Sequence, residues 1–154
     1  MGYTIIDVLD KLIKVEENGH NMYAAIGAKD SIDVKTKLVL RVFEKEQNKH
    51  IVIYKKLREQ AAKKNLEEID FDIYDKVSNL ISKFIYSYPE NIVDVKDLLR
   101  FFFNLEKEKL ALTISIQGLL VRRLKDMDSH AYNALTEIIK EKEKYVGDIQ
   151  IFLK

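Results

Sequence analysis

A helix-capping residue, followed at fixed spacings by an aspartate and a glutamate, occurs twice along the chain. This repeat constrains the fold more than any other feature. Thr4 and Asp94 can each cap a helix, and an aspartate follows each cap three residues later, as in a capping box. A glutamate, Glu16 or Glu106, lies 12 residues after each cap. Apolar residues at helical spacing follow both caps. Two helices of one type are therefore predicted, one in each half of the chain.

A second pair of helices keeps a common register in the same way. Asp33 precedes His50 by 17 residues, and Asp128 precedes Tyr145 by 17 residues. Both segments again carry apolar residues at helical spacing. Because caps and apolar positions align together, the economical explanation is a duplicated helical hairpin.

The predicted fold is all-α and forms a single domain, residues 1–154. One hairpin spans about 4–63 and the other about 94–154, and a long, partly helical crossover of about 64–93 joins them. Two hairpins with an apolar stripe on every helix bury those stripes best against each other, which predicts a four-helix bundle. Only one proline and five glycines occur in 154 residues, which leaves little turn chemistry for an all-β fold.

Composition excludes several classes of function. Lysine and arginine number 26 against 25 aspartates and glutamates, and the two signs are interleaved, so no basic patch for nucleic acid is expected. A membrane span requires roughly 20 consecutive apolar residues, and the sequence contains no such run, so no membrane association is expected. The chain has no cysteine, which removes disulfides and thiolate chemistry. No signal-peptide pattern begins the sequence, so we expect a cytoplasmic protein.

Four short motifs carry a resemblance to a known family. They are VEENGHNMY (Val15–Tyr23), FEKEQNKHIVIYKKL (Phe43–Leu57), NLEKEKLALT (Asn104–Thr113) and IIKEKEKYVGDI (Ile138–Ile149). In the first, Glu16 precedes Tyr23 by seven residues. By order, spacing and duplication, the motifs resemble the four helices of rubrerythrin-like proteins of the ferritin-like superfamily. The resemblance covers nearly the whole chain and implies a ferritin-like bundle.

The resemblance also implies where a dimetal site would lie. Ferritin-like dimetal proteins take one Glu from each of two helices and a Glu-x-x-His motif from each of the other two. Glu16, His50 and Glu106 stand at three of these six ligand positions. Iron is the metal that the family implies, with manganese or zinc as alternatives.

The other three ligand positions depart from the family pattern. Gln47 stands where a glutamate is expected, and Lys142 and Tyr145 stand where the fourth helix should carry Glu and His. A protonated lysine has no lone pair and repels a cation. A complete dimetal centre is therefore not expected, and two arrangements remain open.

The first arrangement is a site for one metal ion on the three remaining ligands. Gln47, Glu46 or His20 would complete it. The second arrangement is an internal polar network without metal, since two inward-facing carboxylates would otherwise be buried at high cost. Lys142 would supply a positive charge to this network, and Tyr145 and Gln47 would donate hydrogen bonds.

The expected function follows from these alternatives. We expect a rubrerythrin-related protein with an incomplete dimetal-carboxylate site that is non-catalytic or binds at most one metal ion. The alternative is a diiron or dimanganese oxidoreductase that reduces peroxide or oxygen and takes electrons from an external donor protein. The sequence does not decide whether the protein is an enzyme. A homodimer is expected, with the apolar run 119–121 as one candidate contact.

Overall fold

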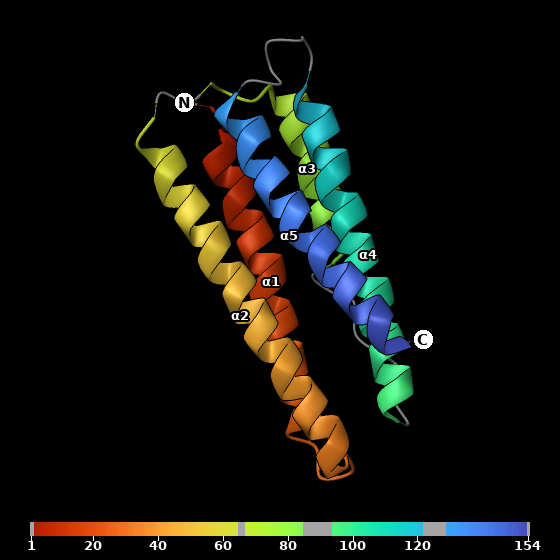
Figure 1. Ribbon diagram of the computed structural model, residues 1–154. Helices are drawn as coiled ribbons and strands as arrows, with labels where there is room; N and C mark the ends of the chain where they lie inside the picture. Colours follow the sequence, from red (N-terminus) through yellow and green to blue (C-terminus); the bar gives the residue numbers. More distant parts are fainter. Residues whose placement is uncertain (1, 65–66, 85–93, 122–128, 154) are drawn as a thin grey trace.

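The computed structural model describes residues 2–64, 67–84, 94–121 and 129–153, without the side chain of Phe152. Five helices occupy these ranges (Figure 1). They are α1 (Ile5–Gly27), α2 (Val34–Ala62), α3 (Phe71–Ser82), α4 (Val95–Leu120) and α5 (His130–Leu153). Apart from one isolated bridge between Tyr3 and Ile69, the described ranges contain no β-structure. The predicted all-α class is confirmed.

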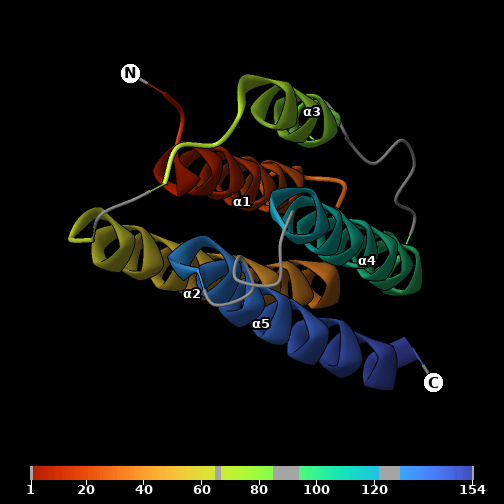
Figure 2. The same cartoon turned by 90° about the horizontal axis from the view of Figure 1, so that it is seen from above.

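The four long helices lie alongside one another as two antiparallel pairs. α1 packs most extensively on α2, and α4 packs most extensively on α5. The short helix α3 contacts α1 and α4, and Figure 2 shows it on the side away from α2 and α5. None of the helices in the described ranges has the length and apolar character that crossing a membrane requires.

Local side-chain bonds explain where the helices begin. Thr4 and Asp7 form the predicted capping box, in which the Thr4 amide donates to Asp7 Oδ2 at 2.8 Å. Asp33 Oδ1 accepts from the Thr36 amide at 2.7 Å. Asp94 Oδ1 accepts from the amide three residues later at 2.9 Å. Each bond satisfies an amide that the first helical turn leaves without a partner. The predicted cap at Asp128 lies outside the described residues.

The crossover adds one short amphipathic helix. Ile73, Val77 and Ile81 are its buried positions, spaced four residues apart, and they join the apolar cluster formed with α1 and α4. The N-terminal segment holds this region in place, because the Ile69 amide donates to the Tyr3 carbonyl at 2.7 Å. The crossover was predicted to be partly helical, and α3 is the helical part of it that the structure describes.

The interior consists of two apolar clusters with a polar layer between them. One cluster includes the first half of α1 and the second half of α2; the other includes the end of α1 and the beginning of α2. The same division runs through α4 and α5. On every long helix, buried polar residues lie between the two clusters, and these residues are Glu16, Gln47, His50, Glu106, Lys109 and Lys142. The bundle therefore places its only charged layer at mid-length, as far as the described residues extend.

Leu119 and Leu120, in the predicted dimer contact, are half-buried and pack against the first apolar cluster.

Candidate functional site: a buried glutamate and lysine centre

Four charged side chains meet in the polar layer, and all four are withdrawn from solvent. Glu16 on α1 is 2% exposed, Glu106 and Lys109 on α4 are 0% and 3% exposed, and Lys142 on α5 is 1% exposed. Burying an isolated charge is very unfavourable, so each charge in this layer requires a partner of opposite sign.

Lys142 reaches both carboxylates from α5. Its Nζ lies 2.9 Å from Glu106 Oε2 and forms a second ion pair with Glu16 Oε1. Glu16 belongs to the first helical pair and Glu106 to the second. The ammonium group of Lys142 therefore links the two pairs through one oxygen of each carboxylate.

Lys109 makes the same kind of bridge with the remaining oxygens. Its Nζ lies 3.1 Å from Glu106 Oε1 and 3.4 Å from Glu16 Oε2. All four carboxylate oxygens are thus paired with an ammonium group, and two negative charges balance two positive charges. We refer to Glu16, Glu106, Lys109 and Lys142 as the central ion-pair group.

Neutral side chains add hydrogen bonds around the central ion-pair group. Gln47 Nε2 donates to Glu106 Oε1 at 2.8 Å. The Tyr23 hydroxyl donates to the same oxygen at 3.5 Å, and the Tyr54 hydroxyl donates to Glu16 Oε1 at 3.5 Å. Burial raises the pKa of both tyrosines, and the nearby carboxylates raise it further, so the two phenols remain protonated donors.

The electrostatic balance keeps Glu106 and Lys142 ionised. Burial alone would raise the pKa of Glu106, but the ammonium groups of Lys109 and Lys142 lower it to about 2. Burial alone would lower the pKa of Lys142, but Glu106 and Glu16 raise it above its usual value. Opposite charges at contact distance outweigh desolvation here. Lys142 is therefore a fixed cation at neutral pH and not a free amine.

A glycine on α1 makes room for one of the lysines. Gly19 follows Glu16 by three residues, as Lys109 follows Glu106, so the two positions correspond in the repeat. A Cβ atom at Gly19 would lie 3.2 Å from Lys109 Nζ and 3.7 Å from the Gln47 side-chain carbonyl carbon. A side chain at position 19 would therefore compete with the ammonium group for space.

His50 and Tyr145 lie beside the central ion-pair group in the same layer. Their rings meet edge to face, with centroids 5.1 Å apart. Burial lowers the pKa of His50 to about 4, and the positive charge of Lys142 contributes to the shift. Burial raises the pKa of Tyr145. Both side chains are thus neutral at physiological pH.

The predicted site residues meet only in part. Glu16, Glu106, Gln47 and Lys142 bond directly to one another, and His50 lies in the same buried layer. Tyr145 does not donate the hydrogen bond that was expected, since its hydroxyl has no partner among the described residues. Glu46 and His20, the supplementary metal donors expected beside Gln47, are half-buried. In the described residues, no hydrogen bond or ion pair joins either side chain to the central ion-pair group.

These side chains do not fit a dimetal group. The oxygens that would face two metal ions are already bonded to two ammonium groups. An amide and a phenol stand at positions where the ferritin-like pattern has a carboxylate and an imidazole. Across the described ranges, no three His, Asp or Glu side chains are placed to hold one metal ion together.

Lys109 was missed at the sequence level, although a signal for it exists. It lies three residues after Glu106, and residues at this spacing share one face of a helix. If Glu106 points inward, Lys109 does too. Gly19 at the corresponding position in the first hairpin was the second signal, since glycine is unfavourable inside a helix unless space is needed.

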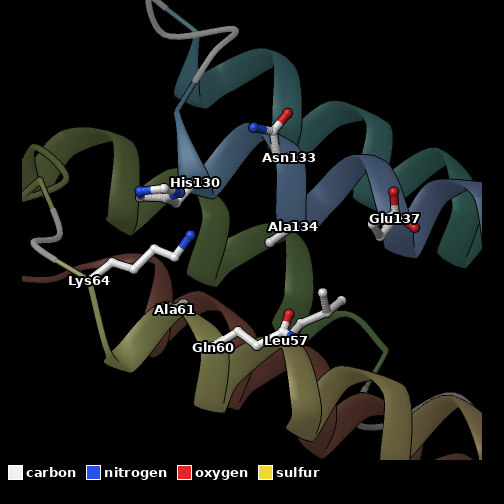
Figure 3. Close-up of a pocket in the computed structure, with 8 residues that line it drawn as sticks. All are labelled: Leu57, Gln60, Ala61, Lys64, His130, Asn133, Ala134 and Glu137. Carbon is white, nitrogen blue, oxygen red and sulfur yellow. The ribbon is translucent and has the colours of Figure 1, made fainter.

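A separate cleft lies on the surface between the end of α2 and the start of α5 (Figure 3). Its volume is about 180 Å³, and its lining consists of Leu57, Gln60, Ala61, Lys64, His130, Asn133, Ala134 and Glu137. Figure 3 shows the Lys64 amino group pointing toward His130. The cleft contains no member of the central ion-pair group.

Comparisons with known proteins add no family assignment. No protein-family model matches the chain, no curated protein was found to match it, and no solved structure was found to match it.

Proposed function

We propose that this protein is a rubrerythrin-related helical bundle in which the central ion-pair group stands in place of a dimetal centre. In this proposal the protein is a non-catalytic scaffold that binds at most one metal ion. One observation carries the proposal: each of two buried ammonium groups bridges both buried carboxylates.

Charge balance supports this function. A pair of divalent ions needs several carboxylates to neutralise it, yet Glu16 and Glu106 are the only buried carboxylates in the described residues. Both are neutralised by Lys109 and Lys142. For a metal ion to enter, at least one lysine would have to leave the centre or lose its proton. The raised pKa of Lys142 makes loss of the proton unfavourable.

The ion pairs of the centre connect different helices, which supports a structural role. Lys142 joins α5 to α1, and Lys109 joins α4 to α1. Buried ion pairs add little net stability compared with apolar packing, but a wrong pairing of the helices would leave buried charges without partners. We therefore assign the centre the task of fixing the register between the two hairpins.

The test is metal binding by the full chain, purified without chelator or a histidine tag. The protein is incubated anaerobically with ferrous iron, freed of unbound iron and analysed for its metals. We expect at most about one equivalent of iron, with no peroxide or oxygen reduction. About two irons per chain, with turnover of peroxide by a reduced donor, would overturn the proposal in favour of a diiron oxidoreductase.

Exposed carboxylates can bind iron weakly, so the assay needs a matched control. Glu137→Gln removes a carboxylate that lies on the surface cleft and outside the centre. Glu106→Gln removes a carboxylate of the centre itself. Iron that remains in both variants is surface-bound, whereas iron lost only in Glu106→Gln belongs to the centre.

A further inference from the structure

Three buried polar atoms beside the central ion-pair group have no hydrogen-bond partner in the described residues. They are Gln47 Oε1, His50 Nδ1 and the Tyr145 hydroxyl. Their residues are 0%, 1% and 5% exposed, so bulk solvent cannot satisfy them. The other unpartnered buried atom of this kind in the described ranges belongs to Ser78 on α3. Buried polar groups are nearly always hydrogen-bonded, so a cluster of three indicates an unassigned partner.

The three atoms belong to buried side chains of α2 and α5 in the polar layer. Gln47 and His50 are separated by one helical turn on α2, and both are buried. The His50 ring meets the Tyr145 ring of α5 edge to face at 5.1 Å. Gln47 uses its Nε2 to donate to Glu106, so its Oε1 is the acceptor that remains. This bond to a carboxylate also fixes which end of the amide is which.

The chemistry of the three atoms selects the kind of partner. Gln47 Oε1 only accepts, the Tyr145 hydroxyl can donate, and Nδ1 of a neutral imidazole accepts or donates according to its tautomer. An anion would need donors throughout and would be repelled by Gln47 Oε1. A cation would find no free carboxylate here, because the two ammonium groups of the centre already pair with Glu16 and Glu106. Only a small neutral molecule that both donates and accepts satisfies all three atoms.

We infer that a water molecule is bound inside the bundle at Gln47, His50 and Tyr145. It donates to Gln47 Oε1, accepts from the Tyr145 hydroxyl and completes the hydrogen bonding of His50 Nδ1. Water of this kind commonly makes about three hydrogen bonds to buried polar groups. Because Gln47 and His50 are on α2 and Tyr145 is on α5, the water links the two hairpins. This inference goes beyond the proposed function and does not depend on it.

A high-resolution crystal structure of the full chain, with anomalous data at the iron edge, tests the inference. We expect one light-atom peak within about 2.7–3.2 Å of each of the three polar atoms. The Tyr145→Phe variant removes the donor and should lose this peak. The Tyr23→Phe variant is the control, because it removes a hydroxyl that already bonds to Glu106, and it should keep the peak.

The same site can be followed in solution by NMR. Long-lived water should give a nuclear Overhauser effect to the His50 ring protons in the wild type and in Tyr23→Phe, but not in Tyr145→Phe. Absence of the peak, or a direct hydrogen bond from Tyr145 to His50 or Gln47, would overturn the water site alone. An anomalous iron peak at this position would overturn the water site, whereas the proposed function is overturned only by about two irons per chain with turnover of peroxide.

Discussion

Gly19 of α1 and Lys109 of α4 hold corresponding positions in the two hairpins, and the missing side chain of one accommodates the ammonium group of the other. A Cβ atom at Gly19 would approach Lys109 Nζ to 3.2 Å. Lys109 cannot easily move aside, because it is paired with both Glu16 and Glu106. The two helical pairs therefore differ at the position where the bundle needs its second cation.

Gly19→Ala should destabilise the protein, although alanine is the better helix former. The added methyl group crowds an ammonium group that two ion pairs hold in place, so we expect the free energy of unfolding to fall by about 1 kcal/mol or more. Urea denaturation measures it. Gly118→Ala and Gly147→Ala are the controls, since nothing lies within 4 Å of a Cβ at either position. Both should gain up to about 1 kcal/mol. A similar gain for Gly19→Ala would contradict the crowding argument.

Lys142→Met should be strongly destabilising because it leaves two buried carboxylates with one cation. Breaking a buried ion pair from one side typically lowers stability by about 3–5 kcal/mol. A second change, Glu16→Gln, should recover much of that loss, since the remaining Glu106 and Lys109 balance in charge. Chemical denaturation of the wild type, the two single variants and the double variant gives the unfolding free energies for a double-mutant cycle.

The matched control for Lys142 is Lys140→Met on the same helix. The Lys140 side chain is 68% exposed, and its ion pair with Glu137 is long, at 3.8 Å. Such surface substitutions usually change stability by less than about 0.5 kcal/mol. Equal effects of Lys140→Met and Lys142→Met would show that the buried charge pairs contribute nothing specific.

Stability should decline in mild acid because of His50. Its pKa is about 4 in the folded protein, against 6.5 for the ordinary side chain, so the unfolded chain binds the proton first as pH falls. Stability is complete above pH 6.5 and is lost progressively toward pH 4. A difference of 2.5 pKa units corresponds to about 3 kcal/mol. Unfolding experiments across this range should show the decline, and a His50→Gln variant should lack it.

A second acid transition should follow from Glu106. Its pKa is lowered to about 2 from 4.5, so its contribution is present above pH 4.5 and is lost as pH falls toward 2. This transition should persist in the His50→Gln variant, which separates the two groups. If the His50→Gln variant lost both acid transitions, the assignment of one transition to His50 and the other to Glu106 would be wrong.

Metal binding at the centre should require removal of both lysines. Lys142→Glu with Tyr145→His introduces two ligands of the ferritin-like pattern, yet Lys109 would still pair with the carboxylates and repel a cation. We expect this double variant to show no gain in ferrous iron binding, measured by anaerobic equilibrium dialysis. Adding Gln47→Glu and Lys109→Leu to this double variant should produce a gain in ferrous iron binding. Strong binding by the double variant alone would mean that Lys109 leaves the centre readily.

Much of the site could be predicted from the sequence, because helix register is a local property. Spacing together with the family resemblance placed Glu16, Glu106, Gln47 and Lys142 at inward positions. Hydrogen bonds and ion pairs connect these four side chains: Gln47 bonds to Glu106, and Lys142 pairs with both glutamates. The direct hydrogen bond expected from Tyr145 is not formed in the described residues, and the reason is a different one. Whether a phenol reaches an oxygen depends on the distance and tilt between two helices, and neither is encoded within one helix.

The sequence by itself determined the helices and their first turns. The bonds that cap them, at Thr4, Asp33 and Asp94, join residues two or three apart and form wherever the local chain is helical. Tertiary structure decided which charges meet: the ion pair between Lys109 and Glu16 joins residues 93 apart. Such a pair forms only when packing excludes water and leaves each buried charge no other partner, so a pattern within a single helix cannot specify it.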